Sequence, residues 1–130
     1  MVINSNFWKS KRVFLTGHTG FKGSWLTILL SHLGADVCGY SLEPKTNDDL
    51  FNKIYTNISK TIKHNLGDIR DIERLRNLVK DYQPDVVFHF AAQPLVIESY
   101  KDPISTWNIN VMGSLNLLES LKTIDKKCSV

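Results

Sequence analysis

Apolar residues follow two alternating patterns along the chain: short β-branched or aromatic runs, and longer segments in which apolar residues recur at helical spacing. The short runs predict strands and the longer segments predict helices, with polar residues, Gly or Pro between them. The expected strands cover residues 12–16, 35–42, 61–66 and 85–91, and a fifth begins at 128–130. The expected helices cover residues 24–33, 48–55, 71–82 and 103–124.

This regular alternation predicts an α/β fold in which parallel strands are joined by right-handed helical crossovers. We expect a doubly wound sheet with strand order 3-2-1-4-5, truncated at the fifth strand. Several large apolar residues at helical spacing are expected to face its core: Trp25, Trp107, Val111, Leu115, Leu118 and Leu121.

Three glycines follow the first expected strand at three-residue spacing: Gly17, Gly20 and Gly23. Between a strand and a helix, such glycines bind a dinucleotide. The first allows a tight turn, the second lets the backbone approach a pyrophosphate, and the third lets the helix pack closely. N–H groups at the helix start would then face the phosphates. The pattern predicts a Rossmann-type dinucleotide-binding domain; a βα turn in another doubly wound protein is the alternative.

Composition indicates which broad class of protein the chain belongs to, and it argues against nucleic-acid-binding, metal-binding and membrane proteins. With 42% hydrophobic and 22% charged residues, the 130-residue chain is expected to form one soluble domain. The net charge of +3 is scattered, so we expect no nucleic-acid partner. Cys38 and Cys128 fall in expected strands without metal-ligand spacing, which predicts reduced thiols, no metal and a cytoplasmic location. The mostly polar residues 1–11 indicate no signal peptide, and no apolar run is long enough for a membrane span.

Polar residues after the second and third expected strands are candidates for adenosine contacts. Ser41 stands about 20 residues past the glycines, where an acid commonly accepts the ribose hydroxyls, and Glu43 follows it. Serine tolerates a hydroxyl or a phosphate, so NAD and NADP both stay open, and Glu43 is equally well a solvated loop residue. Asp68 and Ile69 could hold the adenine amino group and ring, whereas Asp71 fits a helix cap better. The alternative is that both aspartates compete to cap the helix.

The fourth expected strand closes with residues that allow a backbone to pass against a flat cofactor: Phe90, Ala91, Ala92 and Gln93. A tight strand–loop corner is the alternative. We interpret His89 as a hydrogen-bonded core histidine and Asn110 as a structural residue near the site. His18 and Lys22 lie in the glycine turn, where Lys22 could contribute charge to a pyrophosphate or face solvent.

Segments 16–25, 67–71, 89–93 and 110–113 together resemble the extended short-chain dehydrogenase/reductase superfamily. His18, Lys22, Phe7-Trp8 and the loop 93–96 narrow the resemblance to the sugar-nucleotide 4,6-dehydratases that act on CDP-glucose. The resemblance runs from residue 7 onward and covers the N-terminal, cofactor-binding part of such enzymes. It implies that residues 1–130 are an NAD-binding domain without the C-terminal substrate domain, because the chain stops inside an expected strand.

The resemblance implies a bound NAD that oxidises the sugar at C4, elimination of water across C5 and C6, and return of the hydride to C6. By position, it implies pyrophosphate contacts at Gly17, Gly20, Phe21, Lys22 and Gly23, a ribose contact at Ser41, adenine contacts at Asp68 and Ile69, and nicotinamide-side contacts at Phe90, Ala91, Ala92 and Gln93.

Ser99 falls where relatives approach the sugar nucleotide, and Ile97 stands where an arginine is expected. The family's Tyr-x-x-x-Lys pair is absent, so the catalytic residues are expected beyond residue 130 and the chain alone is expected to be inactive. We expect a homo-oligomer without membrane association. Alternatives are a nucleotide-sugar 4-epimerase or reductase with the same cofactor half, and a non-catalytic dinucleotide-binding module.

Overall fold

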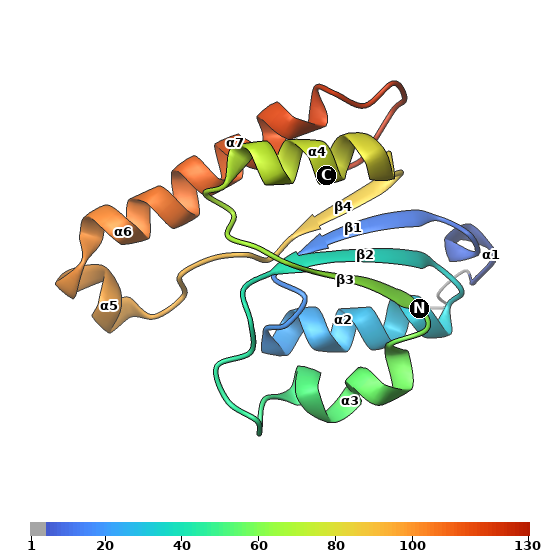
Figure 1. Cartoon of the computed structure of the whole chain (residues 1–130), viewed down its shortest axis with the longest axis horizontal. Helices are drawn as coiled ribbons and strands as arrows, with labels where there is room; N and C mark the ends of the chain where they lie inside the picture. Colours follow the sequence, from blue (N-terminus) through green and yellow to red (C-terminus); the bar gives the residue numbers. More distant parts are fainter. Residues whose placement is uncertain (1–4) are drawn as a thin grey trace.

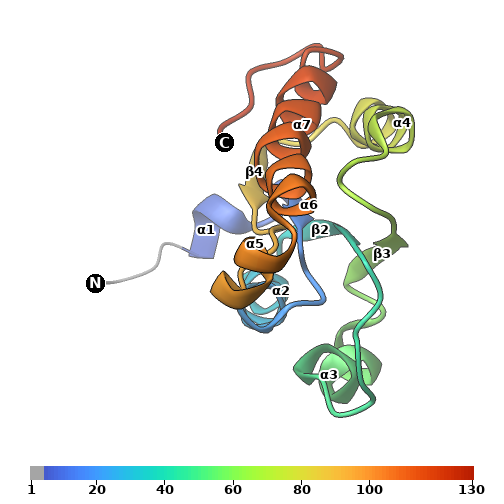
Figure 2. The same ribbon diagram turned by 90° about the vertical axis from the view of Figure 1, so that its left-hand side faces the viewer.

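The computed structural model describes residues 5–130 and shows one parallel sheet between two helical layers (Figure 1). The strands β1 (Arg12–Thr16), β2 (Asp36–Ser41), β3 (Ile62–Leu66) and β4 (Val86–His89) lie in the order β3-β2-β1-β4. One layer is made of α2 (Phe21–His32) and α3 (Leu50–Ile58), the other of α4 (Ile72–Tyr82) and α7 (Gly113–Leu121). Figure 2 shows the two layers on opposite sides of the strands. The expected Rossmann-type α/β class and the order 3-2-1-4 are confirmed.

Two apolar clusters hold the layers together because successive strand side chains point to opposite faces of the sheet. Buried residues on the α2–α3 face include Val13, Leu15, Leu30, Val37, Phe51, Ile58 and Ile62. Those on the α4–α7 face include Phe14, Cys38, Tyr40, Leu75, Val79, Val87 and Leu117. Both faces of β1 and β2 are therefore buried, as a parallel sheet requires.

Three shorter helical pieces complete the described chain: α1 (Ser5–Trp8), α5 (Val96–Lys101) and α6 (Pro103–Trp107). A π-helical turn, Asn108–Met112, joins α6 to α7, so the long helix expected at 103–124 runs from Pro103 to Leu121 and is locally widened. The sequence pattern missed α1 and α5, which are too short for a periodic signal. Of the expected polar segment 1–11, residues 1–4 lie outside the described residues.

Several helices and strands begin or end at other residues than the sequence pattern predicts. Helix α2 begins at Phe21 rather than Ser24, because Gly20 is already its extended N-cap. β4 has four residues rather than seven. The expected fifth strand is a single bridge between Ser129 and Val86, so Cys128 precedes the bridge rather than lying in a strand.

The expectation that Trp25 and Trp107 lie in the core is wrong, since they are 54% and 64% exposed. Helix α2 turns mostly small residues toward the sheet instead: Gly23, Ser24 and Thr27 are buried, together with Leu30. Ser24 and Thr27 can be buried because each hydroxyl donates to the carbonyl four residues back.

The expected inward face of the last helix is also only partly correct. Leu121 packs against the α4–α7 core, but Val111, Leu115 and Leu118 are 41%, 45% and 52% exposed. Their helical spacing is real; within residues 5–130, however, the buried face of α7 is the one that carries Gly113, Leu117 and Ser120.

Candidate functional site

Gly17 and Gly23 are required by the packing of the turn after β1. Gly17 has φ +73°, and a Cβ there would lie 2.6–2.8 Å from backbone atoms of Phe90 and Ala91. A Cβ on Gly23 would overlap the Gly17 carbonyl oxygen and approach the His18 Cα at 2.7 Å. Any larger residue at either position would push the turn away from β4 or from α2.

Gly20 differs, because nothing in its own conformation requires a glycine. Its φ of −73° and ψ of 167° suit any residue, and a Cβ would meet only the Gly17 carbonyl oxygen at 3.3 Å. Gly20 is exposed and caps α2 without a side-chain hydrogen bond, so no side chain of the cap occupies the N–H groups of the first turn, at Phe21 and Lys22. A side chain at Gly20 would stand where a pyrophosphate could approach this backbone. The turn thus has an open helix N-terminus of the kind that can bind a phosphate.

A cleft of about 400 Å³ lies beside this turn, lined by Thr19, Gly20, Phe21, Asp48, Asp49, Leu50 and Lys53. Phe21 is 72% exposed and Lys22 is exposed, so both side chains are free of the core. The structure brings these two expected pyrophosphate residues together with Gly17, Gly20 and Gly23 on one turn.

Ser41, at the end of β2, is tied to the turn through Thr19. The Thr19 Oγ1 lies 2.7 Å from the Ser41 Oγ and donates to the Leu42 carbonyl at 2.8 Å. Because the Thr19 hydrogen points to Leu42, the Ser41 hydroxyl donates to Thr19 and keeps its lone pairs free. The expected ribose residue therefore adjoins the glycine turn as an acceptor, while Glu43 is exposed beyond it.

Asp68 and Ile69 follow β3, but their side chains are engaged within the chain. The Asp68 carboxylate accepts hydrogen bonds from the backbone N–H, Nε and Nη2 of Arg70, at 2.6–2.9 Å, which lowers the pKa of Asp68. Ile69 is 5% exposed and packs against Gly113 of α7. Asp71 accepts from the Arg74 N–H at 3.1 Å, which confirms the expected helix cap.

His89 lies in a chain of hydrogen bonds that fixes the corner after β4. The Thr16 Oγ1 accepts from the N–H groups of Phe90 and Ala91, at 3.1 and 3.2 Å, and lies 2.7 Å from the His89 Nδ1. The His89 Nε2 lies 2.9 Å from the Ser114 Oγ. Since Ser114 donates to the Asn110 carbonyl, it accepts from the imidazole, which is neutral and protonated on Nε2. Partial burial also lowers the pKa of His89. The interpretation of His89 as a hydrogen-bonded, structural histidine is confirmed, although it lies at the margin of the core.

Asn110, in the π-helical turn, holds the backbone of Gln93 with two hydrogen bonds. Its Oδ1 accepts from the Gln93 N–H at 2.8 Å, and its Nδ2 donates to the Gln93 carbonyl at 3.1 Å. The Gln93 side chain donates to the Thr106 hydroxyl at 3.0 Å. Asn110 is therefore structural, as expected, and it positions the segment 90–93 at the same sheet edge as the glycine turn.

Ser99, on α5, donates to its own helix at the Val96 carbonyl, 2.6 Å away, and Ile97 is 66% exposed. These residues lie beyond the sheet, where α5 and α6 extend from it (Figure 1). Among residues 5–130, no group of three His, Cys, Asp or Glu side chains could hold a metal ion, and no helix is long and apolar enough to cross a membrane.

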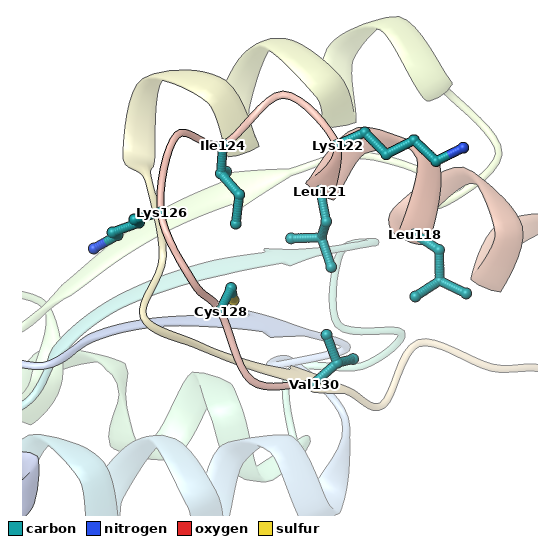
Figure 3. Close-up of a pocket in the computed structure, with 7 residues that line it drawn as sticks. All are labelled: Leu118, Leu121, Lys122, Ile124, Lys126, Cys128 and Val130. Atoms are coloured by element: carbon teal, nitrogen blue, oxygen red, sulfur yellow. The ribbon is translucent and has the colours of Figure 1, made fainter.

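A second hollow, of about 350 Å³, lies between the end of α7 and the C-terminal segment (Figure 3). It is lined by Leu118, Leu121, Lys122, Ile124, Lys126, Cys128 and Val130. None of these belongs to the expected site, so the hollow is separate from the glycine turn.

Comparison with known proteins decides the family. The model of the family described as GDP-mannose 4,6 dehydratase matches residues 14–130. The chain belongs to this family.

Within the GDP-mannose 4,6 dehydratase family, the chain is 50% identical over 123 residues to the CDP-glucose 4,6-dehydratase of Salmonella typhimurium, covering 95% of this chain and 34% of that enzyme. It is 33% identical over 116 residues to the GDP-mannose 4,6-dehydratase of Yersinia enterocolitica, covering 86% of this chain and 31% of that enzyme. The chain thus spans about a third of the length of these curated relatives. The resemblance to extended short-chain dehydrogenase/reductase dehydratases is confirmed.

A solved structure supports the same family fold. The UDP-glucose-4-epimerase of Stenotrophomonas maltophila, with bound NAD and formylated UDP-arabinopyranose, superposes with a TM-score of 0.76 at 28% identity. The match covers 92% of this chain and 35% of the epimerase.

Sequence reasoning about this family member missed two features of the site. The first is the support of residues 90–93 by Thr16, which only the pairing of β1 with β4 brings close. The second is the side chain of His18, which leaves the turn and is fully buried. No spacing rule in the sequence links either residue to its partner.

Proposed function

We propose that residues 1–130 are the NAD-binding domain of a nucleotide-sugar 4,6-dehydratase that converts CDP-glucose to CDP-4-keto-6-deoxyglucose. The 50% identity with the Salmonella enzyme carries the proposal, because the identity with the GDP-mannose enzyme is only 33%. In this proposal, the substrate domain and the groups that transfer protons belong to the part of such enzymes that this chain does not match. Reduced thiols and a nucleotide-sugar substrate suit a cytoplasmic enzyme.

The residues present fit NAD. The backbone of Gly20, Phe21 and Lys22 would hold the pyrophosphate at the helix N-terminus, with Lys22 adding positive charge. Gly17 and Gly23 would keep that backbone in place. When bound, NAD supplies an acceptor for the hydride at C4 of the sugar and a donor that returns it to C6.

Ser41 favours NAD over NADP. Its hydroxyl hydrogen is used on Thr19, so the oxygen can accept from a ribose hydroxyl but has no hydrogen for a phosphate. The adenine would lie near Asp68 and Ile69. Calorimetric titration should give tighter binding of NAD than of NADP; the reverse order would contradict this role of Ser41.

At the other end of the cofactor, the backbone of residues 90–93 would line the nicotinamide side. The Thr16–His89–Ser114 hydrogen bonds and the Asn110 amide would keep this segment fixed while the ring is bound. Ser99 would approach the nucleotide sugar from α5. Ile97 offers no charge there, so other residues must hold the substrate phosphates.

A chimera tests the activity. The matching segment of the Salmonella CDP-glucose 4,6-dehydratase is replaced by this chain, and the product is followed by mass spectrometry with CDP-glucose and NAD. We expect the 4-keto-6-deoxy product. A folded chimera that binds NAD but forms no product would contradict the proposal. The 130-residue chain alone should give no turnover, because no Tyr-x-x-x-Lys pair occurs in it.

A 4-epimerase with the same cofactor half is the second candidate, favoured by the fold shared with the NAD-bound epimerase. Replacing the matching segment of that epimerase by this chain tests it. Activity of the epimerase chimera on UDP-glucose, with an inactive dehydratase chimera, would favour this candidate. We expect the opposite result.

A further inference from the structure

The side chain of His18 links the glycine turn to the far side of β2. Its ring lies against Gly39, where a Cβ would sit 2.6 Å from ring atoms, and packs edge-on against Phe51 of α3 with centroids 5.1 Å apart. Its Nε2 lies 2.7 Å from the Nδ1 of His64 on β3. The His64 ring in turn contacts Phe51 and Tyr55 of α3, with centroids 5.0 and 5.3 Å away. The pair thus connects the turn with β3 and α3.

The unpartnered nitrogen of His18 decides how the pair shares its protons. The Nδ1 of His18 is buried and, among the described side chains, is the one buried nitrogen or oxygen without a hydrogen-bond partner. An unpaired acceptor costs less than an N–H donor whose nearby acceptor, the Tyr40 carbonyl, is already used by the Gly17 N–H. His18 is therefore protonated on Nε2 and donates to the Nδ1 of His64.

Protonation of His64 would disturb the turn. A doubly protonated His64 must donate from Nδ1, so the Nε2 of His18 must accept and its proton must move to Nδ1. The backbone of Tyr40 is the nearby group that favours a protonated His18 ring, and its carbonyl already accepts the Gly17 N–H at 2.9 Å. A proton on Nδ1 would compete with Gly17 for this carbonyl, at the first glycine of the turn.

We propose that His64 is a positioning residue for the dinucleotide site, acting through His18, and that it makes cofactor binding sensitive to acid. This inference rests on the proposed NAD site. The role of the pair is indirect, because neither ring is among the proposed NAD contacts: His18 is fully buried and His64 lies on β3.

The surroundings keep the pair neutral near neutral pH. Burial and the neighbouring His64 lower the pKa of His18 to about 3, against a smaller opposite effect of the Tyr40 backbone. Burial lowers the pKa of His64, and Glu43, in the loop after β2, raises it in part. From α3, Phe51 and Tyr55 face the His64 ring. The affinity should therefore be retained at neutral pH and be lost as the pH falls below the usual histidine range.

Two substitutions separate the effect of the His18–His64 hydrogen bond from the effect of protonating His64. His64→Asn places an amide oxygen where Nδ1 accepts, so it keeps the bond but cannot titrate. His64→Leu removes both. His32→Leu, on the exposed end of α2, is the matched control. NAD is titrated calorimetrically into each purified protein at neutral pH and at about pH 4.5, below the usual histidine range.

We expect the wild-type affinity to fall in acid and that of His64→Asn to hold at both pH values. His64→Leu should lose about tenfold in affinity at neutral pH, the equivalent of one hydrogen bond. The control should behave as the wild type. In the protein without NAD, nitrogen NMR shifts should show His18 protonated on Nε2; protonation on Nδ1 at neutral pH would overturn the inference.

The results also separate this inference from the proposed function. If the wild type binds NAD and His64→Leu binds equally well at both pH values, the positioning role is wrong and the NAD site stands. If the folded wild type binds no NAD at either pH, the proposed function is wrong and the positioning role falls with it.

Discussion

The two sides of the candidate site differ in how their shape is fixed. The glycine turn and the start of α2 are fixed by buried polar contacts: Thr16, His18, Thr19, Ser24 and Thr27 are all buried. The helices after β4 present apolar side chains to solvent instead. Val96, Ile97, Tyr100, Ile104 and Trp107 are 64–84% exposed, and α5 and α6 extend from the sheet (Figure 1).

This difference indicates where the chain itself organises a site. Around the turn, Thr16, His18 and Thr19 each have a partner in a neighbouring strand, so the geometry of the turn is built into the fold. Around α5 and α6, the anchors are the clamp between Asn110 and Gln93 and the hydrogen bond from the Gln93 side chain to Thr106. We therefore expect substitutions of the buried residues of the turn to affect binding and stability together, and substitutions on the exposed helical face to affect neither.

The largest effect is expected from Gly17→Val. This change combines a positive φ with backbone atoms at 2.6–2.8 Å, so it should lower the free energy of unfolding by about 3 kcal/mol or more. Gly34→Ala is the control, because Gly34 has φ +79° but no atom closer than 3.8 Å, and should cost about 1 kcal/mol. Urea denaturation measures both. Equal losses would show that the contact with Phe90 and Ala91 does not fix the turn.

The second-largest effect is expected from acid, which should destabilise the protein through the buried histidines near the glycine turn. Burial lowers the pKa values of His18, His64 and His89, so below about pH 6.5 the unfolded state binds more protons than the folded state. The free energy of unfolding should therefore fall as the pH drops below that value, by up to about 1.4 kcal/mol per pH unit for each histidine. Urea denaturation at several pH values checks this. A stability that stays flat down to about pH 5 would contradict neutral, buried histidines.

A smaller effect is expected at the cap of α4. Asp71→Ala removes the acceptor of the Arg74 N–H and should lower the free energy of unfolding by about 1 kcal/mol. Asp71→Asn should retain most of it. Thermal unfolding measures the difference, and an unchanged midpoint for Asp71→Ala would mean that the cap contributes nothing.

The smallest effect on stability is expected at Leu118, which is 52% exposed beside the hollow in Figure 3. Leu118→Lys should change the free energy of unfolding by less than about 0.5 kcal/mol. The wild type should self-associate at high concentration through the apolar edge beside β4, and the variant should do so less. Light scattering that shows the wild type to be a monomer at every concentration would contradict this.

The sequence predicted what depends on local pattern. The order of the first four strands, the glycine turn and the Asp71 cap follow from periodicity and spacing, and the structure confirms them. Trp25 was misplaced because helical spacing marks an apolar face without saying which face meets the sheet. The His18–His64 and Thr16–His89 contacts join residues 46 and 73 positions apart, so only the paired strands could reveal them.

Titration of the protein with NAD, in the wild type and in Gly20→Val, tests the central claim most directly. Gly20 is the one glycine of the turn that the fold itself does not require. We predict that the wild type binds NAD, and that Gly20→Val binds none while its free energy of unfolding stays within about 1 kcal/mol of the wild type. Equal NAD affinity in a folded Gly20→Val protein would show that the turn does not hold the pyrophosphate.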